Sequence, residues 1–164
     1  METISNEKAP VIYAGFWLRV VAYLIDDLII GFVGFFVALP FIGGIIFSGI
    51  SMDRLSDTDA GTFLGVAGIL GSVLGLVLSG IAVGWLYFAL MESSKNQGTL
   101  GKMALNLKVT DMEGGPISFG RASLRYFGKI LSSMIMMIGY ILAGLTEKKQ
   151  ALHDMIAGCL VIRK

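Results

Sequence analysis

The sequence has 164 residues, of which 55% are hydrophobic and 15% charged, and its formal net charge is +1. It contains 22 glycines and 3 prolines. This composition is far from that of a soluble globular domain and predicts a small integral membrane protein with a few spanning segments. The single cysteine, Cys159, excludes an internal disulfide.

Residues 1–14 form a polar amino terminus that includes Glu2 and Glu7. Because no short apolar core is closed by a small-residue cleavage site, we do not expect a cleavable signal peptide. One membrane domain is expected to follow, over residues 15–164. Its first span covers about residues 17–47, whose carboxyl-terminal part carries no charge. At about 1.5 Å per residue, that part is long enough to cross a hydrocarbon core of about 30 Å.

The second span covers about residues 62–91 and lies within a run, residues 60–91, that has no charged side chain. That run is longer than a perpendicular helix needs, so we expect the helix to be tilted or to project beyond the bilayer. Such helices pack closely where small residues recur, either within one chain or between copies in a homo-oligomer. The small residues recur here at Ala67, Gly71, Gly75 and Ser79, with a second row at Gly80 and Gly84.

The distribution of Lys and Arg predicts the orientation of both spans. The link at residues 48–61 has one arginine, Arg54, against three aspartates, whereas residues 92–129 contain six basic side chains. Since positive residues are retained in the cytoplasm, we expect the amino terminus and residues 92–129 to be cytoplasmic and the link to be outside.

A third apolar run, residues 130–145, is intermediate in length between a short span and a re-entrant or interfacial segment. The tail at residues 146–164 is basic, as is the segment before the run. This favours a re-entrant hairpin broken near Gly139 over a third crossing. Both alternatives remain open, and with them the side of the tail, which the hairpin would leave in the cytoplasm.

Short β-type runs occur in the cytoplasmic segment and at the carboxyl terminus. In LNLKVTDMEGGPISF, residues 105–119, two such runs flank a Gly-Gly-Pro turn and predict a small hairpin. The terminal CLVIRK, residues 159–164, predicts another short strand.

A polar helix is expected between these β-type runs and the third apolar run. Ser118 is placed to cap a helix that begins near Phe119. On this helix Arg121, Arg125 and Lys129 recur every four residues and so share one face. A basic face there can bind anionic lipid headgroups. The alternative is that these side chains simply extend toward water, without recognising lipid.

Three charged side chains stand at the start of the first span. On a helix, Arg19, Tyr23 and Asp26 share one face, and Asp27 points about 100° away. Arg19 and Asp26 are roughly 10 Å apart along the axis, so each needs another partner or water. A charge inside the bilayer costs roughly 2.5 to 3.5 kcal/mol, which makes Asp26 a candidate functional residue. For Arg19 and Asp27, the alternative is a position at the headgroups.

The late segment LHDMIAG carries His153 and Asp154. If the tail returns to the inner end of the first span, Asp154 can pair with Arg19 or lie beside Asp26. His153 is the only histidine, so no metal site is expected, and no nucleophilic triad or phosphate-binding loop is visible. We therefore expect no enzyme activity, no cofactor and no nucleic-acid partner.

Together, Arg19, Asp26 and Asp154 resemble the signature residues of the RDD family of small bacterial membrane proteins, named for one arginine and two aspartates. The resemblance covers nearly everything from Gly15 onward. It includes QGTLGK with Lys102, LKV, SFGRASLR with Arg121 and Arg125, and the terminal LVIR, in the same order. Cys159 departs from the family, which more often has threonine there. The resemblance implies a transport-related role in the bacterial inner membrane, with cation/proton exchange as its most specific form.

Two functions from different classes fit these residues. The first is transport, either of a small ligand or by cation/proton exchange, in which Asp26 alternates between a proton and a monovalent cation and Arg19 and Asp154 set its affinity. Two or three spans cannot enclose a pathway, so this function requires an oligomer. In the second, the protein is a non-catalytic membrane adaptor or assembly factor, and the Arg/Asp/Asp set is a buried polar lock that holds the tail against the bilayer.

Both functions share one expected fold and one set of supporting residues. The fold is an all-α membrane protein with two long transmembrane helices, a third short spanning or re-entrant helix, and a small cytoplasmic β-hairpin-like element. The side chains expected to support the site are Tyr23, Asp27, Lys102, Arg121, Arg125 and His153.

Overall fold

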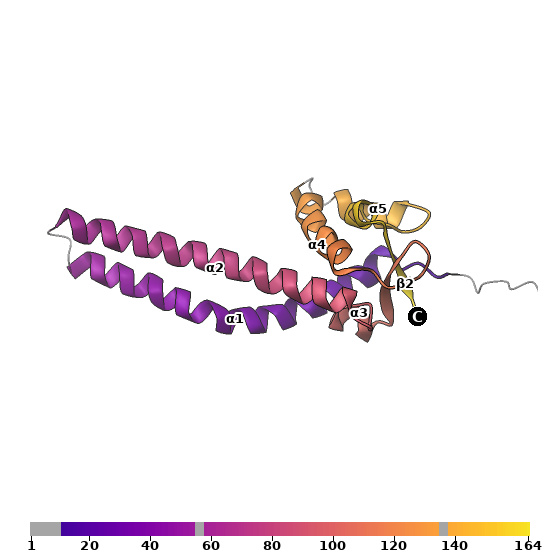
Figure 1. The fold of residues 1–164 in the computed structure, drawn as a ribbon, viewed down its shortest axis with the longest axis horizontal. Coiled ribbons are helices and arrows are strands. Elements are labelled where there is room, and N and C mark those ends of the chain that lie inside the picture. The colour runs from indigo at the N-terminus through magenta and orange to yellow at the C-terminus, as the bar shows by residue number, and fades with distance from the viewer. Residues whose placement is uncertain (1–10, 55–57, 135–137) are drawn as a thin grey trace, which may run out of the picture. The chain divides into compact units, whose positions relative to one another are not determined.

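A computed structural model describes residues 11–54, 58–134 and 138–164 (Figure 1). The elements are α1 (Phe16–Arg54), α2 (Asp59–Ser93), α3 (Leu100–Ala104), β1 (Leu107–Asp111), α4 (Phe119–Met134), α5 (Ile138–Leu145), α6 (Leu152–Ala157) and β2 (Cys159–Arg163). The chain divides into two compact units. One is the hairpin unit, residues 25–87, and the other, here the terminal unit, combines residues 11–24 with residues 88–164. The mainly helical fold with a small antiparallel sheet confirms the predicted fold class.

In the hairpin unit, α1 and α2 lie side by side as two long apolar helices (Figure 1). Both are long and apolar enough to cross a membrane, and the most apolar stretch of each is exposed on the outside of the protein. Large side chains such as Phe32, Phe47, Phe63 and Leu70 are therefore mostly exposed and need hydrocarbon as their solvent. Both predicted spans are confirmed as helices, and each extends beyond the predicted limits.

Small residues let α1 and α2 approach each other in this unit. A side chain at Gly75 would meet the ring of Phe41, and one at Gly68 would meet the hydroxyl of Ser48. Gly75, one of the small residues predicted from the sequence, is therefore used for packing within the chain. Gly71 and Gly80 have open space around them, so the predicted contact between copies along these rows stays a prediction.

In the terminal unit, β1 and β2 form a two-stranded antiparallel sheet in which Leu107 lies opposite Arg163. The predicted hairpin within residues 105–119 is therefore wrong in its partner, because β1 pairs with the terminal strand. The residues after β1 turn back on Asp111, whose Oδ1 accepts a hydrogen bond of 2.7 Å from the Gly115 amide. The same oxygen accepts a hydrogen bond of 3.0 Å from the Glu113 amide, which makes an Asx turn, and residues 112–118 form no second strand.

The amino-terminal segment joins the other edge of β2. Tyr13 forms an antiparallel bridge with Ile162, and the Ala14 amide donates to the carbonyl of Val161 at 2.9 Å. The segment before α1, the strand after α3 and the end of the tail thus share one small sheet. Since a hydrogen-bonded sheet cannot be divided by a bilayer, all three lie on the same side of the membrane.

The third apolar run is shared between the end of α4 and α5, which pack side by side (Figure 1). Because the strands on either side of this run pair with each other, a single crossing between them is excluded. The eight residues of α5 are also too few to span a bilayer. The re-entrant or interfacial alternative stays a prediction. α5 begins at Ile138, and residues 135–137, beside the predicted break at Gly139, lie outside the described residues.

The start of α4 agrees with the position predicted from the sequence. The amide of Arg121 donates to Oγ of Ser118 at 3.4 Å, and the helix begins at Phe119. Ser118 is thus the predicted cap. Both α4 and α5 pack against α6, so the LHDMIAG segment lies in contact with these two helices.

Candidate functional site

Charged side chains from five helices of the terminal unit meet in one buried group, which we call the charge cluster. They come from the first turn of α1, the last turns of α2, and from α3, α4 and α6. The members are Arg19, Glu92, Lys102, Arg125, Lys129, His153 and Asp154.

Asp154 is fully buried, and both of its carboxylate oxygens accept hydrogen bonds. Oδ1 accepts from Nε of Arg125 at 2.7 Å, and Oδ2 accepts from Nη1 of Arg19. Oδ2 also lies 3.2 Å from the amide of Ala151, so Asp154 caps the start of α6 with its own side chain. Burial alone would raise the pKa of Asp154, but the charges of Arg125 and Arg19 outweigh it and hold the pKa far below its usual range.

Glu92 is the second buried carboxylate of the cluster and was missed by the sequence analysis. Its Oε2 accepts from Nη1 of Arg125 at 2.9 Å, and its Oε1 accepts from Nζ of Lys102. Nζ of Lys129 lies 4.0 Å from the same Oε1. A signal was present, because Glu92 is the first charge after a long uncharged run and stands directly before six basic residues.

Arg125 joins the two carboxylates through different nitrogens of one guanidinium. Its side chain is 2% exposed, so the prediction that Arg125 faces lipid headgroups is wrong. Burial disfavours its charged form, but Asp154 and Glu92 outweigh burial and raise the pKa of Arg125 above its ordinary value. Its neighbour Arg121 is exposed, and Nζ of Lys129 lies 3.7 Å from the centre of the Phe88 ring.

Arg19 connects the cluster to the amino terminus and to the loop after α5. Besides Asp154, its guanidinium donates to the carbonyl of Ala14 at 3.1 Å and to that of Lys149 at 2.6 Å. One side chain near the amino terminus is thus bonded to two carboxyl-terminal residues that lie 130 and 135 positions away in the sequence. The pairing of Arg19 with Asp154, one of the two arrangements that the sequence left open, is present.

The two lysines of the cluster have lowered pKa values. Burial lowers the pKa of Lys129 to about 7, against the attraction of Glu92. Burial also lowers the pKa of Lys102, and the charge of Arg125 adds to this effect. Since two carboxylates face four basic side chains, a partly neutral Lys129 reduces the imbalance near neutral pH.

His153 lies on the inner face of α6, 4% exposed. Its Nδ1 is 3.4 Å from Oγ of Ser132, and its Nε2 is 3.5 Å from Oδ1 of Asp154. Burial lowers the pKa of His153 to about 3, despite the opposing charge of Asp154, so the ring is neutral at physiological pH. Among the described residues, no group of three or more His, Cys, Asp or Glu side chains is arranged to hold a metal ion.

Asp26 belongs to the hairpin unit, whereas Arg19 and Asp154 belong to the terminal unit. It is 1% exposed, and its Oδ1 accepts a hydrogen bond of 2.7 Å from the hydroxyl of Tyr87. Tyr87 was missed, because an aromatic residue within a span carries no special signal. The prediction that Asp26 shares one site with Arg19 and Asp154 stays a prediction.

Two of the supporting residues, Tyr23 and Asp27, lie outside these contacts. Tyr23 is about half exposed and stacks on Phe88 with ring centres 6.3 Å apart. Asp27 is exposed, as expected for a residue that points away from the Asp26 face.

Comparison of this chain with known proteins identifies a family and two relatives. The RDD family matches residues 13–158. The uncharacterized protein YxaI of Bacillus subtilis is 36% identical over 151 residues, covering 92% of this chain and 97% of that protein. The uncharacterized membrane protein YteJ of the same organism is 32% identical over 158 residues, covering 93% of this chain and 82% of that protein. No solved structure matches the chain.

Proposed function

Because the chain belongs to the RDD family of membrane proteins, we propose that it is a non-catalytic membrane adaptor, whose two spans anchor a small charge-locked unit at the membrane surface. The observation that carries this proposal is the position of Arg125. Its guanidinium binds Asp154 and Glu92 at once, while Arg19 binds the other oxygen of Asp154. The signature arginine and the late aspartate are thus parts of an extended set of ion pairs.

Ion pairs of this kind suit a structural role. Both carboxylates are almost fully buried, and each accepts from at least two basic side chains. Removing one partner of such a pair leaves an uncompensated buried charge and typically costs about 3 to 5 kcal/mol. A set of charges that is costly to disturb fixes one arrangement of α3, α4 and α6.

The proposal includes an orientation. The terminal unit lies in the cytoplasm of the bacterial cell, and only the link between α1 and α2 lies outside. It is supported by the six basic residues of 92–129 against the single arginine of the link. Anionic lipid is the expected neighbour of Arg121, the exposed arginine of α4.

A second candidate, exchange of a monovalent cation for a proton, is favoured by the position of Asp26. This carboxylate is buried between two apolar helices, and a phenol hydroxyl donates to it. A carboxylate in such a place is a default candidate for an ion-binding residue. A pathway would require several copies of the hairpin, because two helices cannot enclose one.

Flux through liposomes separates the two functions. Purified protein is reconstituted in liposomes that contain a pH-sensitive dye, and sodium, potassium or lithium is added outside. The adaptor predicts no cation-dependent proton flux from folded wild-type protein. A flux that disappears in Asp26→Asn and persists in the matched control Asp27→Asn, an exposed neighbour, would overturn the adaptor in favour of exchange.

A further inference from the structure

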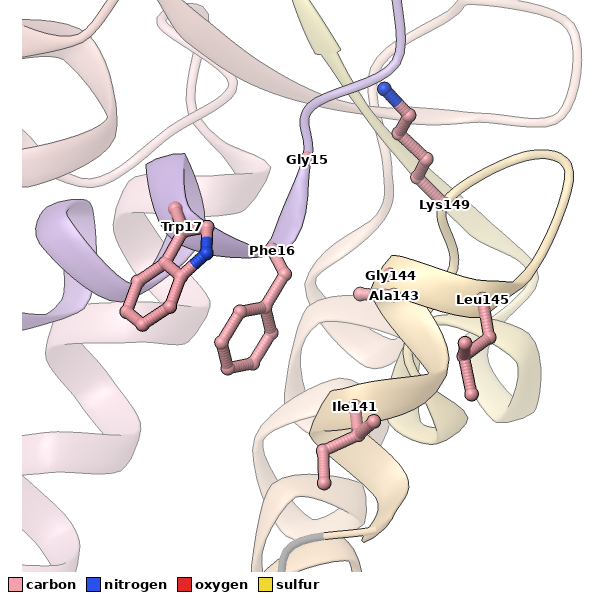
Figure 2. Close-up of a pocket in the computed structure, with 8 residues that line it drawn as sticks. All are labelled: Gly15, Phe16, Trp17, Ile141, Ala143, Gly144, Leu145 and Lys149. Carbon is pink, nitrogen blue, oxygen red and sulfur yellow. The ribbon is translucent and has the colours of Figure 1, made fainter.

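An open hollow of about 380 Å³ lies in the terminal unit, beside the first turn of α1 (Figure 2). Its volume is in the range of about 300–1,000 Å³ that is typical of small-molecule sites. The lining is mainly apolar and includes Phe16, Trp17, Ile141 and Leu145. Among its lining residues, Lys149 is the charged one.

The hollow has a polar end and an apolar end. Figure 2 shows Lys149 at one end, with its ammonium pointing away from the ring of Phe16 and from the side chains of Ile141 and Leu145. Trp17 is 75% exposed and Leu145 is 76% exposed. These apolar groups need a nonaqueous neighbour, whereas the ammonium needs water or an anion.

The position of the hollow along the chain indicates what fills it. Phe16 and Trp17 begin α1, a candidate membrane span, and Trp is enriched at the interface between membrane and water. A molecule at this level with an apolar chain and an anionic head matches both ends of the hollow.

We propose that the hollow binds one molecule of an anionic phospholipid. An acyl chain lies against Phe16, Ile141 and Leu145, and the phosphate pairs with the ammonium of Lys149. The carbonyl of Lys149 already accepts a hydrogen bond from Arg19, so the loop that presents the ammonium is fastened to the charge cluster. The site is independent of the adaptor role and requires only that the protein sits in a membrane.

Native mass spectrometry of the full-length protein in detergent tests the headgroup. Phosphatidylglycerol and phosphatidylcholine with identical chains are titrated separately. We expect one molecule of phosphatidylglycerol to bind more tightly than phosphatidylcholine. Lys149→Gln should weaken phosphatidylglycerol roughly fivefold, the effect of one basic residue near a membrane surface. The matched control Lys148→Gln, on an exposed neighbour, should bind as wild type does.

The acyl-chain contact is tested with Ile141→Glu, which places a carboxylate in the apolar end. Ile141 is half exposed, and the control Phe127→Glu changes an equally exposed apolar residue of α4 that does not line the hollow. Loss of lipid in Ile141→Glu but not in Phe127→Glu supports the site. Equal affinity of the protein for phosphatidylglycerol and phosphatidylcholine overturns the proposal. So does a loss of lipid affinity that is as large in the controls, Lys148→Gln and Phe127→Glu, as in Lys149→Gln and Ile141→Glu.

A photo-crosslinking amino acid in place of Leu145 identifies the occupant directly. In nanodiscs of phosphatidylglycerol and phosphatidylcholine in equal parts, we expect adducts at position 145 to be enriched in phosphatidylglycerol relative to adducts at position 127. The variant Lys149→Gln should remove this enrichment. Crosslinks from position 145 to a second copy of the chain, or no enrichment over position 127, would show that the hollow is not a lipid site.

Discussion

Nε of Arg125 lies 2.7 Å from Oδ1 of Asp154, although 29 positions separate the two residues in the sequence. Both side chains are almost wholly buried, and the same guanidinium reaches Glu92 at 2.9 Å. α4 and α6 are therefore joined by a charge pair rather than by apolar packing alone, and the same guanidinium joins the end of α2 to α4. The stability of the terminal unit should depend strongly on this one arginine.

Replacing Arg125 with alanine should lower the free energy of unfolding by about 3 to 5 kcal/mol, because two buried carboxylates lose a shared partner. Chemical denaturation in detergent, followed by circular dichroism, measures the change. Arg121→Ala is the matched control, since this exposed arginine is on the same helix, and it should change stability by about 0.5 kcal/mol or less. Similar losses in the two variants would contradict the role assigned to Arg125.

Lys129 should make stability depend on pH above neutrality. Its pKa is about 7 in the folded protein, below the ordinary value of 10.5. Between these values the unfolded chain binds a proton that the folded chain does not, so the stability rises with pH across this window. Burial is the main cause of this lowered pKa; the charges of Lys102 and Arg125 lower it further, and those of Glu92 and Asp154 oppose the shift.

Unfolding free energies at several values between pH 7 and pH 10 measure this effect for wild type and Lys129→Gln. The difference between the two proteins isolates Lys129 from other groups that titrate in the same range. Wild type should gain stability with pH relative to the variant. Parallel curves would mean that Lys129 keeps an ordinary pKa in the folded protein.

The hydrogen bond from Tyr87 to Asp26 should stabilise the hairpin unit. Tyr87→Phe removes the hydroxyl and keeps the ring, and a typical intramolecular hydrogen bond is worth about 0.5 to 1.5 kcal/mol. Thermal unfolding in detergent should show this loss. Tyr13→Phe, which alters a partly exposed tyrosine before α1, is the control and should leave the unfolding temperature nearly unchanged. An unfolding temperature of Tyr87→Phe equal to that of wild type would contradict the hydrogen bond from Tyr87 to Asp26.

Cysteine labelling in intact cells tests the orientation. Cysteines at Thr58, Glu113 and Lys164 place exposed probes in the outer link, after β1 and at the end of the tail. A membrane-impermeant thiol reagent should modify position 58 and miss positions 113 and 164, because β1 and β2 share one sheet. The native Cys159 is buried and should stay unlabelled. Labelling of positions 113 and 164 but not 58 would mean that the orientation is the reverse of the one proposed. Labelling of only one of positions 113 and 164 would contradict the pairing of β1 with β2.

Features that depend on neighbouring residues were predictable. The spans follow from uncharged runs, since an apolar helix longer than the bilayer is thick has few other stable environments. The Ser118 cap follows from a local hydrogen bond. Even the pairing of Arg19 with Asp154 could be expected, because an arginine at the start of a span needs a partner and the tail offers one.

Features that depend on partners distant in the sequence were not predictable. The run at β1 could pair with the nearer β-type run or with the terminal one, and both have the composition of a strand. Arg125 and Arg121 stand four residues apart on one helix, yet Arg125 is buried and Arg121 exposed. A helical pattern shows which side chains share a face, but not whether protein or lipid covers each of them.

The central claim is that Arg19 and Asp154 act as one structural unit, and a double-mutant cycle in detergent tests it most directly. Thermal unfolding is measured for Arg19→Ala, Asp154→Asn and the double variant. Because each single change leaves the other charge without one of its partners, the double variant should be less destabilised than the sum of the singles, by about 0.5 to 3 kcal/mol. The control cycle of Arg19→Ala with Asp27→Asn should be additive. Strict additivity for Arg19 with Asp154 would contradict the account.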